Sequence, residues 1–208
     1  MTDERHRLAA GLRDLRLDVP DSGIDTLLGF LDLLEKWNAV YNLTAIRDRT
    51  QWVSHHLLDS LSVAAYVPVG RILDVGTGAG FPGVPLAIVQ PGRHFTLLDS
   101  SQKRTSFLAQ TLATLGLRNA DVVRARVEEF TPDLPFDAAV SRAFADLADF
   151  ARLAGPLVRS GGSLLAMKGL HPDEELTRVP APLAVRATEP LQVPGLDARR
   201  HLVILDKP

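Results

Sequence analysis

The sequence predicts a doubly wound α/β fold, in which a mostly parallel seven-stranded sheet carries helices on both faces behind a helical N-terminal extension. Three observations support this prediction. Short apolar segments typical of buried strands recur after residue 70, helical segments separate them, and a glycine-rich loop follows the first of them. Strands and helices that alternate at this spacing are typical of a parallel sheet that is covered on both faces.

The region before the alternating part is predicted to be helical. Ser22 can cap a helix whose apolar residues recur every three or four positions, and Asp48 can cap another. A shorter helix is expected at residues 3–16. Because the connection to the alternating part is short, we expect residues 1–67 to pack on a domain of residues 68–208 as one compact unit.

The alternating part divides into seven expected strands and four expected helices. The strands are residues 71–75, 94–98, 120–124, 136–141, 163–168, 184–189 and 201–205. The helices are residues 83–89, 102–115 and 145–158, with a weaker helical pattern at 173–178. Gly161 and Gly162 are expected to turn the chain into the fifth strand.

The loop after the first expected strand indicates the class of cofactor. Asp74 lies within the strand pattern, two residues before the first of four glycines: Gly76, Gly78, Gly80 and Gly83. A dinucleotide site needs G-x-G-x-x-G so that a helix N-terminus can approach a pyrophosphate, but that spacing puts Phe81 where the third glycine belongs. The Asp-x-Gly-x-Gly-x-Gly pattern instead suits a cofactor with an adenosine and an amino-acid portion but no phosphate. S-adenosylmethionine fits this description.

Composition narrows the remaining classes. The chain has 208 residues, of which 46% are hydrophobic and 23% charged, as in ordinary globular proteins. It has no cysteine, which excludes disulfides, zinc–thiolate sites and a cysteine nucleophile. No apolar run approaches the roughly 20 residues that span a bilayer, and the N-terminus lacks a signal-peptide core, so we expect a cytoplasmic protein without a membrane partner.

Charge gives little direct support for nucleic-acid binding. The net charge is −2, whereas proteins that bind nucleic acid usually carry a basic footprint. Residues 118–168 nevertheless contain six arginines and a lysine. These residues either form a local basic patch or are scattered over the surface, and the sequence leaves both interpretations open.

The carboxyl ends of the first four strands are expected to form the site, because ligands bind there in doubly wound sheets. The glycine loop lets a cofactor approach the backbone closely. Asp99, at the end of the second strand, can accept hydrogen bonds from both ribose hydroxyls. Residues 126–129 follow the third strand and can meet an adenine edge, while residues 141–144 follow the fourth and can face both cofactor and acceptor.

Several of these residues also have ordinary structural interpretations. Glu128 and Glu129 can be acidic residues at a helix start, favoured by the helix dipole. Arg142 can be a solvated or ion-paired arginine, although its position after the fourth strand favours a functional role. Phe144 is expected to pack rather than to stack on a base, and for Lys168 both interpretations stay open.

Two further clusters are expected to be structural. His55 and Asp59 lie four residues apart beside His56, but two ligands without a third do not make a metal site, so we expect no metal. Capping, packing or a substrate contact is the expected role of these three residues. Trp37 and Tyr41 are expected to be core or interface aromatic residues rather than a stacking platform.

Two motifs that this sequence lacks reduce the number of possible acceptor atoms for the methyl group. Methyltransferases that act on exocyclic amines usually carry an Asn/Asp/Ser-Pro-Pro-aromatic signature after the fourth strand, where this chain has Ser-Arg-Ala-Phe. Transfer to pyrimidine C5 needs a cysteine nucleophile, which this chain lacks. A ring nitrogen with a free lone pair, such as guanine N7, needs neither a base nor a covalent intermediate, only alignment with the methyl group.

Seven motifs extend the pattern beyond the glycine loop. They are LEKWNAVYNLTAI (34–46), HHLLDSL (55–61), DVGTGAGFPGVPLAI (74–88), LLDSSQKRTSFL (97–108), RVEEF (126–130), SRAFA (141–145) and LLAMKG (164–169). Through these motifs, which span about residues 30–170 in order, the chain resembles the bacterial ribosomal RNA small subunit methyltransferase G family, also called the glucose-inhibited division protein B family. The C-terminal RHLVILDK segment is similar but less diagnostic.

The resemblance implies a Rossmann-like class I S-adenosylmethionine-dependent methyltransferase that methylates guanine N7 in the 530 loop of 16S rRNA, on the free rRNA or the small ribosomal subunit. Residues 68–208 would then be the methyltransferase domain, and we expect a monomer. Arg142 would complete the pocket on the substrate side, where we assign it the catalytic role. The expected cofactor-binding residues are Asp74, Gly76, Gly78, Gly80, Phe81, Asp99, Val127, Glu128 and Arg142.

Two other functions stay open. A small-molecule methyltransferase of the same fold would use the N-terminal helices as a lid, and the negative net charge favours it slightly. A non-catalytic module would bind S-adenosylmethionine or assist assembly without transferring a methyl group. The extended motif match favours the rRNA enzyme over both.

Overall fold

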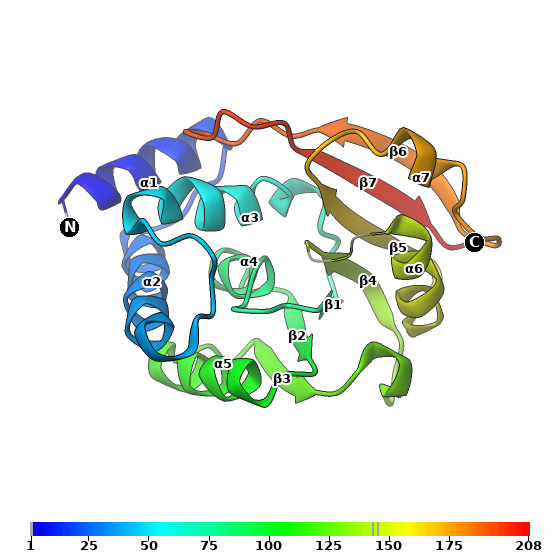
Figure 1. Ribbon diagram of the computed structural model, residues 1–208, viewed down its shortest axis with the longest axis horizontal. Coiled ribbons are helices and arrows are strands. Elements are labelled where there is room, and N and C mark those ends of the chain that lie inside the picture. Colours follow the sequence, from blue (N-terminus) through cyan, green and yellow to red (C-terminus); the bar gives the residue numbers. More distant parts are fainter. Residues whose placement is uncertain (1, 143, 145) are drawn as a thin grey trace.

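The computed structural model describes residues 2–142, 144 and 146–208. Among these residues, seven strands form one sheet in the order β3-β2-β1-β4-β5-β7-β6 (Figure 1). The strands are β1 (Arg71–Val75), β2 (His94–Asp99), β3 (Ala120–Arg124), β4 (Phe136–Ser141), β5 (Val158–Lys168), β6 (Ala184–Pro190) and β7 (His201–Asp206). The four pairs among β1 to β5 are parallel and both pairs that involve β7 are antiparallel, so the predicted mostly parallel sheet is confirmed.

The helical elements of the described chain fall into two groups. Those before the sheet are α1 (Thr2–Asp14), α2 (Asp21–Tyr41), a 3-10 turn (Arg49–Gln51), a π-helix (Val53–Leu58), α3 (Asp59–Leu61) and a second 3-10 turn (Ala64–Tyr66). Those within the alternating part are α4 (Gly83–Val89), α5 (Gln102–Leu115), α6 (Leu147–Ala154) and α7 (Asp173–Leu176), with 3-10 turns at Val127–Glu129 and Gly155–Leu157. Each predicted helix therefore has a counterpart.

The strand order creates a switch point between β1 and β4. From β1 the chain winds outward through β2 to β3, then returns to the other side of β1 and continues through β4 to β5. Crevices form in such sheets where the winding direction reverses, at the carboxyl ends of the two central strands. The glycine loop after β1 and the segment after β4 therefore meet at this crevice.

Alternating side chains of the strands build two separate cores. In β1, Ile72 faces the cluster that includes residues of α2, α4 and α5, while Leu73 faces the cluster of α6. Because successive strand residues point to opposite faces, this alternation requires helices on both sides of the sheet. Figure 1 shows α6 lying apart from the group formed by α2, α4 and α5. The prediction of two covered faces is confirmed.

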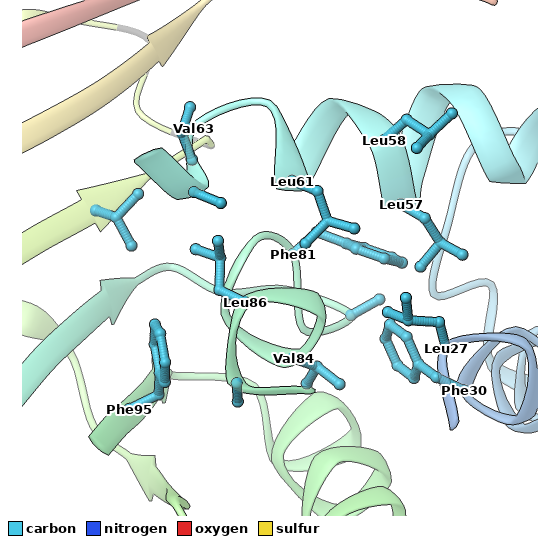
Figure 2. Close-up of a cluster of buried hydrophobic side chains, with 14 of the residues drawn as sticks. Leu27, Phe30, Leu57, Leu58, Leu61, Val63, Phe81, Val84, Leu86 and Phe95 are labelled. Carbon is cyan, nitrogen blue, oxygen red and sulfur yellow. The ribbon is translucent and has the colours of Figure 1, made fainter. Parts of the chain in front are cut away.

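The N-terminal helices pack directly against the glycine-loop region. Figure 2 shows Phe81 close to Leu57 of the π-helix, to Leu61 of α3 and to Leu27 and Phe30 of α2. The Phe30 and Phe81 rings lie 5.1 Å apart between centroids, and all five side chains are buried. Burying a side chain of this size contributes about 1.5–3 kcal/mol. The extension thus supplies one wall of the site as well as part of the core.

The expected cap at Asp48 is confirmed, whereas the one at Ser22 is wrong. The Asp48 carboxylate accepts a hydrogen bond from the Thr50 amide at 2.9 Å. Helix α2 begins one residue before Ser22 and has Pro20 at its N-cap position, without a side-chain cap. Ser22 instead lies inside the first turn, where its carbonyl accepts a hydrogen bond from the Thr26 hydroxyl at 2.7 Å.

The expected role of the glycine pair is also wrong. Strand β5 already begins at Val158, and the register with β4 shifts around Gly161 and Gly162. Gly161 has a φ of 73°, and a Cβ on Gly162 would lie 2.7 Å from the Asp137 carbonyl oxygen. These two glycines therefore form an irregularity inside the strand, which the turn-forming tendency of glycine does not distinguish from a turn before it.

The helix expected at residues 145–158 is shorter than predicted. Helix α6 ends at Ala154, and the 3-10 turn that follows contains Pro156, which cannot donate the hydrogen bond that would continue an α-helix. Of the predicted site segment 141–145, Ala143 and Ala145 lie outside the described residues.

Candidate active site

The glycine loop leaves β1 with three residues in the left-handed region of backbone conformation. Gly76, Gly78 and Gly80 have φ values of 68°, 62° and 95°. Residues with a Cβ rarely adopt such values, so this path of the loop requires glycine. A Cβ on Gly80 would also lie 2.7 Å from the Val84 side chain, whereas one on Gly78 would have no heavy atom closer than 3.9 Å. Gly78 therefore offers open backbone to a ligand, and Gly80 shapes the turn.

Asp74 holds this loop from beneath. Its Oδ2 accepts hydrogen bonds from the Thr77 hydroxyl at 2.6 Å and from the Gly83 amide at 2.8 Å. Burial raises the pKa of Asp74 to about 6, although these two hydrogen bonds oppose the shift. Asp74 is absent from the walls of the cavities described below. Its two hydrogen bonds are with the loop, one with the Thr77 side chain and one with the Gly83 backbone.

Gly83 is required for a reason other than cofactor contact. A Cβ at this position would lie 2.6 Å from Asp74 Oδ2 and 2.3 Å from a methyl carbon of Leu97. We expect Gly83→Ala to destabilise the protein by about 1–3 kcal/mol, because α4 must move away from β1 and β2. Urea unfolding measures this loss. Gly92→Ala is the control, since a Cβ there meets no heavy atom within 4 Å; equal stability of the two variants would contradict the argument.

Asp99, at the end of β2, faces the loop from the neighbouring strand. Its Oδ2 accepts a hydrogen bond from the Gly78 amide at 3.0 Å and its Oδ1 one from the Ser101 amide at 2.8 Å. The Arg104 guanidinium lies 3.4 Å from Oδ2. A carboxylate with two oxygens has about four acceptor sites, so capacity for ligand hydroxyl groups remains. Asp99 thus fixes the loop and lines a cavity at the same time.

The first cavity has a volume of about 270 Å³ beside Asp99. It brings together three predicted regions, the end of β1, the end of β2 and the segment after β3. Its walls are Val75, Gly76, Leu98, Asp99, Ser100, Arg104, Ala125, Arg126, Val127, Glu128, Phe144 and Leu153. Phe144 packs on Phe150 with ring centroids 5.2 Å apart, so its expected packing role is confirmed. The cavity combines apolar side chains with the carboxylates of Asp99 and Glu128, which suits a nucleoside.

A second cavity of about 320 Å³ lies on the other side of the loop. It shares Gly76 and Arg104 with the first, so the two adjoin at the glycine loop. Its other walls are Leu43, Thr44, Ala45, Ile46, His56, Thr77, Gly78, Ala79, Phe81 and Arg142. Together the two cavities accommodate a ligand with a nucleoside part at Asp99 and a smaller polar part along the loop. The residues present therefore fit S-adenosylmethionine.

Phe81 contacts both an imidazole and a guanidinium in this second cavity. The His56 ring stacks on it with centroids 4.6 Å apart, and the Arg142 guanidinium carbon lies 5.0 Å from its centroid. A guanidinium over an aromatic face is held by a cation–π attraction. The His56 Nε2 also lies 2.9 Å from the Thr44 hydroxyl. The sequence left packing open for His56, and packing is what the structure shows.

The neighbours of His56 keep its imidazole neutral. Burial lowers the pKa of His56 to about 3, and the charges of Arg142 and His55 act in the same direction. Because this pKa is below the ordinary value of 6.5, the unfolded chain binds the proton first as the pH falls. The stability that neutral His56 contributes is therefore complete above pH 6.5 and decreases as the pH falls towards 3.

This linkage gives a testable pH dependence. We expect His56→Gln to be less stable than the original protein at pH 7.5, where the Phe81 stack is lost. Below pH 6 the difference should narrow by about 1.4 kcal/mol per pH unit, because only the original protein has this histidine to protonate. Urea unfolding of both proteins from pH 7.5 to 4.5 measures the difference in their free energies of unfolding. Asp74, whose raised pKa has the opposite effect on stability, is present in both proteins, so its contribution cancels in this difference. Parallel curves would contradict the assigned pKa shift.

Arg142 connects the second cavity to a third of about 380 Å³. The third cavity shares Ile46, His56 and Arg142 with the second, and its other walls are His55, Asp59, Met167, Lys168, Gly169 and Arg200. Arg142 donates hydrogen bonds to the His55 carbonyl and to Asp59, both at 3.2 Å. Asp59 also accepts a hydrogen bond from Arg200, so both of its oxygens have arginine partners.

Lys168 lies on the same cavity and has acidic and backbone partners. Its ammonium group donates to the Glu175 carboxylate at 2.7 Å and to the Phe144 carbonyl at 3.2 Å. Glu175 also accepts a hydrogen bond from the Leu147 amide at 2.6 Å. Glu175 of α7 thereby links the end of β5 to the start of α6.

Two arginines of residues 118–168 lie away from Arg142. Arg159 pairs with Asp137 near the start of β4, at the opposite end of the sheet. Arg152 pairs with Asp149 on the surface of α6. Lys168 lines the third cavity together with Arg142, and Arg126 lines the first cavity, so these charges are only in part scattered. Trp37 is partly buried 5.6 Å from Phe107, and Tyr41 packs beside it.

Sequence reasoning missed two residues of this site. Arg200 comes from the connection between β6 and β7 yet lines the third cavity, and Arg104 of α5 lines both cofactor cavities. Both lie inside motifs that were recognised, LLDSSQKRTSFL and RHLVILDK. Neither strand nor helix periodicity marks them, because their role depends on which distant segments meet.

The same architecture occurs in solved methyltransferases. The glycopeptide N-methyltransferase MtfA complexed with S-adenosyl-L-homocysteine superposes with a TM-score of 0.65 and 15% identity, over 81% of this chain and 90% of that one. TrmN from Thermus thermophilus superposes with a TM-score of 0.58 and 23% identity, over 72% of this chain and 47% of that one. Fold, glycine loop and paired cavities define a class I S-adenosylmethionine-dependent methyltransferase fold.

Sequence comparison identifies the family within that class. The family model described as rRNA small subunit methyltransferase G matches residues 24–203. A protein named ribosomal RNA small subunit methyltransferase G from Azoarcus sp. (strain BH72) is 48% identical over 99% of this chain and 97% of its own length. Its namesake from Laribacter hongkongensis (strain HLHK9) is 49% identical over 97% of both chains. The chain belongs to the rRNA small subunit methyltransferase G family.

Proposed function

We propose that this protein methylates N7 of a guanine in the 530 loop of 16S rRNA, with S-adenosylmethionine as the methyl donor. The observation that carries the proposal is Arg142, stacked on Phe81 between the paired cofactor cavities and the third cavity. An arginine at this junction can contact both donor and acceptor. Family membership supports rRNA as the acceptor.

In this proposal the residues of the glycine loop and the residues at the strand ends bind different parts of the cofactor. Asp99 accepts hydrogen bonds from the ribose hydroxyls, and Val127 and Glu128 contact the adenine. Gly76 and Gly78 offer their backbone to the amino-acid portion, with Phe81 beneath it. Asp74 and Gly80 act on the cofactor indirectly, by fixing the path of the loop.

For this reaction the protein mainly has to align the guanine N7 with the methyl group of the cofactor. S-adenosylmethionine supplies a methyl group on a sulfonium sulfur. The guanine N7 lone pair forms the new N–C bond while the electrons of the S–C bond stay on sulfur, so no proton leaves and no general base is needed. His56, whose pKa of about 3 keeps it neutral, suits this scheme because it adds no positive charge beside the purine ring.

The proposal extends to the organisation of the protein. The N-terminal residues 1–67 act as an extension of a methyltransferase domain at 68–208, since they wall the second cavity through residues 43–46 and 56. No described helix is both long and apolar enough to cross a membrane. We infer a cytoplasmic monomer that acts on 16S rRNA or on the small ribosomal subunit.

Transfer of a labelled methyl group tests the proposal directly. The purified protein is incubated with labelled S-adenosylmethionine and small subunits that lack the modification, and borohydride–aniline cleavage then maps N7-methylguanine in the 16S rRNA. We expect incorporation and a cleavage in the 530 loop. Incorporation without that cleavage would overturn the site assignment. Transfer to small molecules alone, or cofactor binding without transfer, would favour the alternative functions.

A further inference from the structure

A single buried carboxylate joins two arginines at the third cavity. The Asp59 side chain is 3% exposed, and its Oδ2 lies 3.2 Å from the Arg142 guanidinium. Its other oxygen, Oδ1, accepts a hydrogen bond from Arg200 Nε at 2.9 Å. Both carboxylate oxygens are therefore engaged, each by a different arginine.

The three residues come from distant parts of the chain. Asp59 begins α3 in the N-terminal extension, Arg142 follows β4, and Arg200 precedes β7. Both arginine side chains keep about a quarter of their surface exposed on the cavity side of this buried carboxylate. Asp59 thus fixes the relative position of two guanidinium groups that no local secondary structure connects.

The charge balance at this cavity favours an anionic or electron-rich ligand. Two guanidinium groups share one carboxylate, which leaves a net positive charge, while Lys168 is balanced by Glu175. Guanidinium groups donate hydrogen bonds in a planar fork that matches phosphate oxygens and the carbonyl edge of guanine. The cavity of about 380 Å³ has room for one nucleotide and adjoins the cofactor cavities through Arg142.

Net stabilisation does not account for this arrangement. Taking a carboxylate and two guanidinium groups out of water costs free energy that their mutual attraction offsets only in part, so buried ion pairs are weak sources of stability. The ion pairs instead hold the side chains in place. Moving either arginine away from Asp59 would leave the buried carboxylate with one charged partner fewer, which costs free energy. The positions that Asp59 fixes are those of two residues on the wall of the cavity.

We propose that the third cavity receives the acceptor nucleotide and that Asp59 is a positioning residue of methyl transfer, which holds Arg142 and Arg200 for hydrogen bonds to the nucleotide's carbonyl and phosphate oxygens. This inference rests on the proposed function. It adds a second effect of Asp59: methylation of a neutral ring nitrogen leaves a cationic purine, and the carboxylate offsets the repulsion between that ring and the two guanidinium groups.

Asp59→Asn tests the proposal, because it keeps the size of the side chain and removes the charge. We expect kcat for methyl transfer to small subunits to fall by about 100-fold, with the dissociation constant of S-adenosylhomocysteine unchanged. Asp137→Asn is the matched control, since Asp137 also pairs with an arginine, Arg159, but at the opposite end of the sheet. It should keep the original kcat. An unchanged kcat in Asp59→Asn overturns the proposal.

Arg200→Gln keeps the test decisive where Asp59→Asn does not fold, because Asp59 retains Arg142 as a partner in that variant. We expect a loss of at least about 10-fold in kcat/KM for small subunits with unchanged cofactor affinity. Where both variants fold, the double variant should lose little more than Asp59→Asn alone, since Asp59 acts in part through Arg200 and the two effects are not independent. Original activity in Arg200→Gln, or independent effects that multiply, overturns the proposal.

The two proposals fail in different ways. If the original protein transfers no methyl group to rRNA, the proposed function is wrong and the inference about Asp59 falls with it. If the original protein methylates the 530 loop and Asp59→Asn does so equally well, the proposed function holds and only the positioning role is wrong.

Discussion

Replacing Arg142 by alanine is expected to lower kcat for methyl transfer to 16S rRNA by about 100- to 1,000-fold while cofactor binding persists. Arg142 is shared by the second and third cavities, and its guanidinium carbon lies 5.0 Å from the centroid of the Phe81 ring. Removing it takes away a group that can orient the acceptor beside the methyl donor. Misplacement of the acceptor by about 1 Å suffices for a loss of about 100-fold.

Cofactor binding should survive because most of the cofactor site is independent of Arg142. The first cavity, with Asp99, Val127 and Glu128, does not include Arg142. The loop is held by hydrogen bonds from its own amides and hydroxyl to Asp74 and Asp99. A dissociation constant for S-adenosylhomocysteine close to the original value is therefore the expected result of titration calorimetry.

Arg186→Ala is the matched control for this variant. Arg186 lies on the edge strand β6, pairs with Asp206 at 3.4 Å and is absent from the three cavities of the site. It should keep the original kcat. Full activity in Arg142→Ala would show that Arg142 is not a catalytic residue. Loss of cofactor binding together with activity would show that the main role of Arg142 is to bind the cofactor.

The regular parts of this fold could be predicted because local patterns determine them. Apolar segments of strand length located β1, β2, β3 and β4 to within a residue, and the helical repeat located α5. The errors occurred where tertiary contacts override a local preference. Gly161 and Gly162 look like a turn, yet backbone hydrogen bonds to Lys207, near the C-terminus, hold them inside β5, and the Asp137 carbonyl leaves no room for a Cβ on Gly162.

The same holds for the candidate site: contacts that follow from local patterns could be predicted, and contacts between distant segments could not. Asp99 and the residues of the glycine loop could be predicted, because a parallel sheet brings the ends of its strands to one edge. The joint contact of Asp59 with Arg142 and Arg200 could not, since it links residues 83 and 141 positions apart in the chain. Strand and helix periodicity carries no information on such pairs.

The glycine loop and the first cavity share one acidic residue, Asp99. The sequence assigns Asp99 only to the ribose, whereas its Oδ2 already accepts the Gly78 amide at 3.0 Å. Replacing Asp99 by alanine therefore has two effects. It removes a hydrogen-bond acceptor for the ligand, and it removes the hydrogen bond to the Gly78 amide that supports the loop.

For that reason Asp99→Ala is expected to weaken S-adenosylhomocysteine binding by at least about 100-fold. Hydrogen bonds to a charged group contribute about 1.5–3 kcal/mol each, and two ribose hydroxyls can donate to this carboxylate. Asp99→Asn should fall between the two proteins, because its remaining oxygen still accepts the Gly78 amide. Titration calorimetry measures all three dissociation constants, and circular dichroism establishes that each variant is folded.

Asp121→Asn separates this effect from a general loss of charge. Asp121 lies on the adjacent strand β3, is largely exposed and pairs with His94, outside all three cavities of the site. It should bind the ligand as the original protein does. If Asp99→Asn binds as tightly as Asp121→Asn, the ribose is not held by this carboxylate, and support of the loop through Gly78 is then the whole contribution of Asp99.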